Sequence, residues 1–142
     1  MSSSLKIGEV AGRLSVPVET IRYYEKEGLL PSPTRTTGNY RLYDAGTVER
    51  LTFIRNCRTL GMNLEEVRAL LRAKDQPDTE CGAVNHLVDS HIARIDEHIA
   101  DMQRLKASLA SLRERCGSAR VSRDCGILNE LTHDHDPRKP CC

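Results

Sequence analysis

The sequence predicts a mainly α protein: a winged helix-turn-helix domain, a long helix that pairs antiparallel as a coiled coil, and a short cysteine-containing C-terminal loop. Three observations predict this fold. Two short amphipathic segments are separated by Ser15-Val16-Pro17, a Pro- and Gly-rich segment ends in alternating side chains, and a long apolar stripe lies between Cys81 and Cys116.

The first two helices form the helix-turn-helix. Ile7–Leu14 places its apolar residues on one face, and Pro17 suits the first turn of a second helix that runs to Glu27. Gly28 is typical of the position just after a helix. Two short helices joined by so tight a break are typical of this motif.

The next segment predicts a wing. Pro31 and Pro33 interrupt any helix, Thr37-Gly38-Asn39 has the composition of a turn, and Tyr40–Tyr43 alternates as a strand does. We therefore expect a small β-hairpin within Leu29–Tyr43.

Two further helices complete the domain. Asp44 can cap a helix from Ala45 to Leu60, and Asn63 with Glu66 three residues on resembles a capping box. The Asp-Gln-Pro-Asp linker at residues 75–78 follows, so the winged helix-turn-helix domain is expected at residues 1–75.

From Cys81 to Cys116 the chain has no Pro, and its one Gly is at the first turn. Apolar residues recur every three or four positions, at Val84, Val88, Ile92, Ile95, Ile99, Met102, Leu105, Leu109 and Leu112. So short a chain cannot bury this stripe, so we expect the same helix of a second subunit to cover it, giving a homodimer. The alternative is that the helix folds back onto its own first domain. The expected regions are 76–117 for linker and dimerisation helix, 118–132 for loop and short helix, and 133–142 for a flexible tail.

The charge distribution and the cysteines indicate the kind of partner and the cellular compartment of the protein. The net charge of +1 divides into +4 over residues 1–74 and −3 over residues 75–142, and a basic first half permits nucleic-acid binding. Nothing resembles a targeting segment, and no apolar run approaches the ~20 residues that span a bilayer. We therefore expect a cytoplasmic protein without membrane contact, whose six cysteines are reduced and available as ligands.

The second helix and the wing carry the candidate DNA contacts. In a helix-turn-helix the second helix enters the major groove. Arginine can reach guanine edges or phosphates, and tyrosine hydroxyls suit phosphates. We expect one of Tyr23 and Tyr24 to be buried. The full candidate set is Thr20, Arg22, Tyr23, Tyr24, Arg35, Asn39, Tyr40, Arg41 and Tyr43.

Three cysteines predict a metal site shared between subunits. Cys81 and Cys116 are separated by 35 residues of continuous helix, about 52 Å, so one chain cannot bring them to one ion. Antiparallel pairing would place Cys81 of one subunit beside Cys116 and Cys125 of the other. Three thiolates suit Pb(II), Hg(II) or Cd(II), and Zn(II) with a fourth ligand. The alternative is that these thiols are unrelated.

The sequence resembles the MerR family of transcription regulators in several motifs. They are Ile7–Ala11 (IGEVA), Val18–Glu25 (VETIRYYE), Gly28–Leu30 (GLL), Gly38–Tyr43 (GNYRLY) and Leu60–Met62 (LGM). The resemblance implies a winged helix-turn-helix, a dimerisation helix and a C-terminal metal-binding loop. It also implies a homodimer that distorts promoter DNA so that RNA polymerase can engage it, activating heavy-metal resistance or efflux genes.

The resemblance also narrows the choice of the metal ion that acts as effector. Cys81, Cys116 and Cys125 fall at the ligand positions of the divalent-metal regulators, and the strings around Cys116 and Cys125 resemble the lead- and cadmium-responsive subgroup. Pb(II) or Cd(II) is therefore the implied effector, with Hg(II) or Zn(II) as alternatives. A secondary metal site is implied at His91, His133, His135, Cys141 and Cys142.

The sequence offers no nucleophile–base pair, so we expect no catalytic residues and no enzyme. Rival interpretations are a metal-sequestering protein, a thiol redox switch and a regulator of small organic effectors. The 26 residues after Cys116 are too few for an organic-ligand domain.

Overall fold

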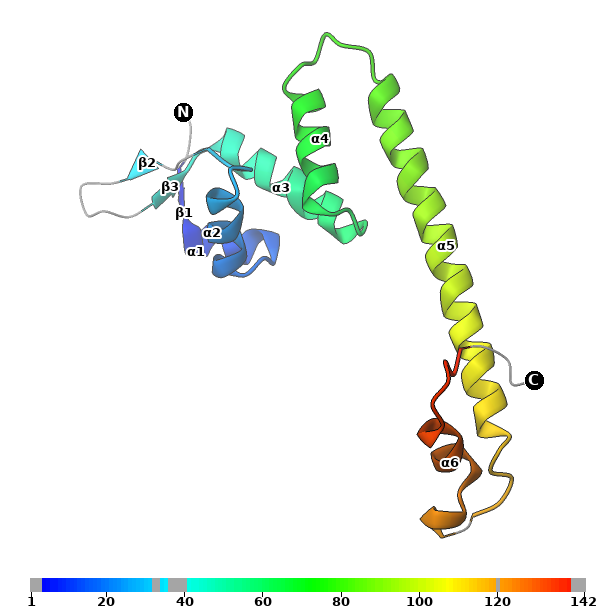
Figure 1. Ribbon diagram of the computed structural model, residues 1–142. Helices are drawn as coiled ribbons and strands as arrows, with labels where there is room; N and C mark the ends of the chain where they lie inside the picture. The colour runs from blue at the N-terminus through cyan, green and yellow to red at the C-terminus, as the bar shows by residue number, and fades with distance from the viewer. Residues whose placement is uncertain (1–3, 32–33, 36–40, 120, 139–142) are drawn as a thin grey trace. The chain divides into compact units, whose positions relative to one another are not determined.

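The computed structural model describes residues 4–31, 34–35, 41–119 and 121–138 (Figure 1). The chain divides into two compact units, Met1–Asn85 and His86–Cys142, and each is described by itself. The first holds the sheet and four helices, and the second is dominated by one long helix.

The predicted helix-turn-helix is present as α1 (Ile7–Leu14) and α2 (Val18–Lys26). Ser15 closes α1 in the left-handed conformation, with φ of 55°, and the Val16 amide then donates to the Ala11 carbonyl at 3.0 Å. Pro17 caps the start of α2 with extended backbone. This tight connection lets the two helices pack against each other without a loop.

A three-stranded antiparallel sheet flanks these helices, in the order β1 (Leu5–Lys6), β3 (Arg41–Tyr43), β2 (Thr34–Arg35). The pairing of β2 with β3 confirms the predicted hairpin. Strand β1 was not predicted, because two residues are too few to show an alternating pattern. The expected turn at residues 37–39 lies outside the described residues.

Helices α3 (Ala45–Thr59) and α4 (Leu64–Lys74) begin at the predicted caps. The Thr47 amide donates to the Asp44 carboxylate at 2.8 Å, and this bond lowers the pKa of Asp44. Asn63 accepts from the Glu66 amide at 2.9 Å, while its own amide donates to the Glu66 carboxylate at 3.1 Å. The capping box is therefore confirmed in both directions.

The core of the first unit is built from the apolar faces of α1 to α4 and from strand β3. Its largest fully buried side chains, together with that of Leu29 after α2, are Val10, Ile21, Tyr43, Leu51, Ile54 and Val67. Cys57 is also buried, and desolvation raises the pKa of its thiol. Cys57 is therefore a core residue, and such a thiol is a poor ligand.

Two arginines connect the end of α2 to α3 and α4. Arg50 donates to the Leu29 carbonyl at 2.8 Å and to the two Asp75 carboxylate oxygens at 2.9 and 3.3 Å. Arg68 donates to both the carbonyl and the carboxylate of Glu27, at 3.1 and 2.9 Å. The end of the second helix is thus fixed by side chains from two later helices.

The long helix α5 runs without interruption over Gly82–Arg113. A short 3-10 turn, η1 (Ser122–Asp124), and helix α6 (Gly126–Thr132) follow, and α6 lies beside the C-terminal end of α5 (Figure 1). The apolar stripe of α5 faces outward, with Ile92, Ile99 and Leu109 at least half exposed. Among the described residues, no helix is both long and apolar enough to cross a bilayer.

Candidate nucleic-acid interface and metal site

The exposed face of α2 carries the accessible DNA candidates. Arg22 is exposed, Tyr23 is 44% exposed, and Thr20 is half-buried. These side chains are the ones that the second helix of a helix-turn-helix can present to a groove. Tyr24 is only 6% exposed, so the expectation that one of the two tyrosines is buried is confirmed.

Two of the predicted DNA contacts, Tyr24 and Tyr43, are buried, and their burial argues against a direct contact with DNA. Tyr43 has no exposed surface, and its hydroxyl donates to the Glu25 carboxylate on α2. Tyr24 packs into the same core, with its ring 6.0 Å from that of Tyr23. Tyrosine is apolar along its ring and polar at its tip, so the sequence could not separate a surface role from a buried one.

The remaining wing candidates stay predictions. Arg35 and Arg41 lie opposite each other in the register of β2 and β3. Asn39 and Tyr40 lie outside the described residues.

The three predicted metal ligands lie at helix ends. Cys81 is exposed and directly precedes α5, whereas Cys116 and Cys125 are half-buried, just after α5 and just before α6. A helix of 32 residues is about 48 Å long. Among the described residues of this single chain, no three His, Cys, Asp or Glu side chains are grouped to hold a metal.

The segments that carry Cys116 and Cys125 approach each other, with Gly126 close to the Arg115 carbonyl. Each segment is held by local bonds: the Arg113 guanidinium donates to the Cys116 carbonyl at 2.5 Å, the Cys116 thiol donates to the Ser118 carbonyl at 3.3 Å, and the Cys125 amide donates to the Ser122 carbonyl at 3.1 Å. Hydrogen bonds from the Leu128 and Ile127 amides and from the Cys116 side chain lower the pKa of Cys125. A thiol whose pKa is lowered is deprotonated more readily and is a better ligand for a soft cation.

The proposed secondary ligands that lie within the described residues are not grouped around one point. His91 is buried, with its Nδ1 3.1 Å from the Arg94 guanidinium. The rings of His133 and His135 are 6.4 Å apart, and His135 Nε2 lies 3.3 Å from a Glu130 carboxylate oxygen. Cys141 and Cys142 fall outside the described residues, so this second site stays a prediction.

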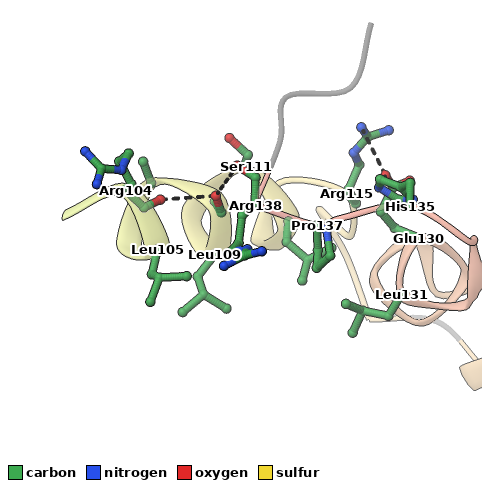
Figure 2. Close-up of a pocket in the computed structure, with 13 residues that line it drawn as sticks. Arg104, Leu105, Leu109, Ser111, Arg115, Glu130, Leu131, His135, Pro137 and Arg138 are labelled. Carbon is green, nitrogen blue, oxygen red and sulfur yellow. Dashed lines mark hydrogen bonds and ion pairs between the residues drawn. The ribbon is translucent and has the colours of Figure 1, made fainter. Parts of the chain in front are cut away.

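A cavity of about 770 Å³ lies where α6 and the following residues meet α5. Leu105 and Leu109 project to the same side of α5, and Leu131 of α6 adds to this apolar surface (Figure 2). Glu130 contacts both Arg115, at 4.0 Å, and His135, and so holds α6 against the end of α5 (Figure 2). This cavity leaves no signal in the sequence, because it depends on contacts between segments that are far apart in the chain.

The fold defines a class: a winged helix-turn-helix protein with an exposed arginine and tyrosine on its second helix, followed by one long helix. Residues 5–74 match the family described as MerR HTH family regulatory protein, and residues 48–112 match MerR, DNA binding. The chain belongs to the MerR family of DNA-binding transcription regulators, which are not enzymes.

Three similar proteins span nearly the whole chain. The HTH-type transcriptional regulator ZntR homolog of Haemophilus influenzae is 40% identical over 95% of this chain and 90% of its own length. A mercuric resistance operon regulatory protein of Bacillus cereus is 38% identical over 89% of this chain and 96% of its own. The crystal structure of the transcription regulator PbrR691 from Ralstonia metallidurans CH34 in complex with lead(II) has a TM-score of 0.80 and 48% identity, covering 90% of this chain and 99% of that one.

Proposed function

We propose that this chain is a metal-responsive transcription regulator that binds promoter DNA as an antiparallel homodimer. Pb(II) or Cd(II) would be held by Cys116 and Cys125 of one subunit and Cys81 of the partner subunit. One observation carries the proposal. The exposed apolar stripe of α5 is nearly symmetric about its midpoint, and the cysteines lie at its two ends.

The symmetry of the stripe specifies a register for two antiparallel helices. If Ile95 faces Met102 of the partner subunit, then Ile92 faces the partner's Leu105. One turn further out, Val88 faces the partner's Leu109. In this register every apolar position meets another within one residue, which is the condition for a continuous buried seam.

The same register brings the thiols together. Extending it beyond both helix ends sets Cys81 opposite Cys116 of the partner subunit, with Cys125 beside Cys116 in the same subunit. The seam was identified from apolar residues alone, so its agreement with the cysteine positions is independent support. Each dimer would hold two equivalent sites.

The donor set supports a soft divalent ion. Three thiolates prefer polarisable cations, and the lowered pKa of Cys125 provides one of them readily. The similar PbrR691 structure was solved with lead(II), and the Bacillus cereus relative is a mercuric resistance regulator. Pb(II) or Cd(II) is our preferred effector, with Hg(II) or Zn(II) as the alternatives.

Each subunit would place one α2 helix and one wing on a half-site of a two-fold operator. Binding of metal ions at the two shared sites would favour one arrangement of the two DNA-binding units over another, because the metal ion binds that arrangement better. We propose that the favoured arrangement distorts the promoter so that RNA polymerase can engage it. The controlled genes would serve heavy-metal resistance or efflux.

A subunit-mixing experiment tests the shared site. Cys81→Ser and Cys116→Ser homodimers each lack every complete site, but the mixed dimer keeps one, formed by Cys81 of one subunit and Cys116 and Cys125 of the other. We expect one tightly bound Pb(II) per mixed dimer and none in either homodimer. Wild-type affinity in the Cys81→Ser homodimer would refute the shared geometry.

Transcription in vitro tests the regulatory role. We expect Pb(II) or Cd(II) to raise transcript yield with the wild type and with Cys57→Ala, a buried cysteine outside the site, but not with Cys81→Ser. Tight metal binding without any change in transcript would instead indicate a metal-sequestering protein. Parallel titration of a promoter reporter with Pb(II), Cd(II), Hg(II) and Zn(II) would rank the effectors.

A further inference from the structure

Each proposed ligand cysteine is followed by a glycine, and only one of the three glycines is crowded. A Cβ atom built on Gly126 would lie 2.3 Å from the Arg115 carbonyl oxygen and 3.1 Å from the Arg115 carbonyl carbon. A Cβ atom on Gly82 or Gly117 would meet nothing within 4 Å.

Gly126 is needed because there is no room for a side chain, and not because of its backbone conformation. Its backbone is not in the left-handed region, unlike Gly28 and Gly61, which have φ of 78° and 83°. The obstructing atoms are the carbonyl group and the Cβ atom of Arg115, two residues beyond α5. No side-chain rotation moves any of them, so rotation cannot relieve the contact. A methyl group there must move α6 and the end of α5 apart.

This close approach lies beside two of the proposed ligand cysteines. Arg115 adjoins Cys116 and Gly126 adjoins Cys125, so the crowded backbone contact is one residue away from each of these two cysteines. The Arg115–Glu130 ion pair supports the same contact one turn further along α6. Separating the two backbones therefore separates the two thiols.

We propose that Gly126 is a positioning residue, whose missing side chain lets Cys125 approach Cys116 closely enough for both to bind one ion. The proposal rests on the proposed function only where it concerns the metal, because the approach of the thiols is a property of the metal-free chain. Gly126→Ala should act through the sulfur–sulfur distance and leave the DNA-binding unit unchanged.

Thiol–disulfide equilibrium measures this distance without metal. In a full-length background that keeps Cys116 and Cys125 and replaces Cys57, Cys81, Cys141 and Cys142 by Ala, one glutathione disulfide oxidises the pair and releases two glutathiones. We expect Gly126→Ala to lower the equilibrium constant about tenfold, as overpacking against fixed backbone implies. Gly117→Ala and Gly82→Ala should stay within about twofold of the parent, since neither methyl meets another atom.

A second measurement covers the case in which the variant disturbs α6 as a whole. The parent protein should close its disulfide more favourably in native buffer than in concentrated urea, because the fold holds the two thiols together. Equal values in the two conditions would overturn the proposal whatever the variant does. So would a Gly126→Ala protein whose disulfide equilibrium matches that of Gly117→Ala.

Metal binding provides a further test of the Gly126 proposal, in chains that retain all six cysteines. The thiolate-to-lead absorption should show about tenfold weaker Pb(II) binding by Gly126→Ala than by Gly117→Ala, with equal affinity of both for duplex DNA. If Gly126→Ala shifts the disulfide equilibrium while even the wild type fails to bind Pb(II), the proposed function fails and the positioning role of Gly126 stands.

Discussion

The apolar stripe of α5 yields a quantitative prediction for dimer formation, through the substitution Ile95→Ala. Replacing isoleucine by alanine removes three carbon atoms, or about 2.4 kcal/mol of transfer free energy if all were buried. Ile95 is 43% exposed in the single chain, so pairing can bury somewhat less than half of the side chain. The loss is therefore about 1 kcal/mol per copy and about 2 kcal/mol per dimer, which raises the dissociation constant about 30-fold.

Sedimentation equilibrium over a dilution series, in metal-free reducing buffer, measures this constant directly. Gln103→Ala is the matched control, because Gln103 is exposed on the same helix and lies off the stripe. Both substitutions favour helix formation, so helix propensity does not separate them. Equal dissociation constants for the two variants would show that the stripe is not the subunit interface.

Three further outcomes are expected. Ile54→Ala, at a fully buried position of α3, should lower the free energy of unfolding by about 2–5 kcal/mol in a urea titration at fixed protein concentration; a loss under about 1 kcal/mol would show that the site is not tightly packed. The Arg50 hydrogen bond lowers the pKa of Asp75, so its ionised form contributes stability above the unfolded pKa near 3.8 that is lost as pH falls through the lower folded value. Asp75→Asn should remove this contribution to the pH dependence of the free energy of unfolding. If the free energy of unfolding falls with acid as steeply in the variant as in the wild type, Asp75 does not make this contribution. Arg22→Ala should weaken DNA binding and reduce the salt slope by about one, whereas Arg72→Ala on α4 should do neither.

The helices were predictable because their signals are local. The capping residues Asp44 and Asn63 and the apolar spacing around them involve neighbours in the chain, so the predicted starts of α3 and α4 agree with the structure. Strand β1 was not predictable, because its pairing partner lies almost forty residues away and it has no alternating pattern of its own.

The candidate sites also divide into features with a local signal in the sequence and features that depend on distant contacts. Spacing alone was enough to predict the three cysteines at the two ends of α5. The burial of Tyr24 and Tyr43 depends on which side of the strand and helix meets the core, and the crowding at Gly126 depends on a contact with Arg115. Such long-range contacts leave no periodic signal in the sequence.

The part-buried bond between Tyr43 and Glu25 has a mechanical consequence for DNA recognition. It ties the wing strand β3 to the last turn of α2, while Arg50 and Arg68 tie the residues just after α2 to the helices that follow. Helix α2 and strand β3 are thus held to each other, and α2 is held to α3 and α4. A movement transmitted through α4 therefore turns α2 and β3 together. In the proposed dimer, the strain imposed on a bound duplex would therefore be set by the angle between the two DNA-binding units, and not by the adjustment of single side chains.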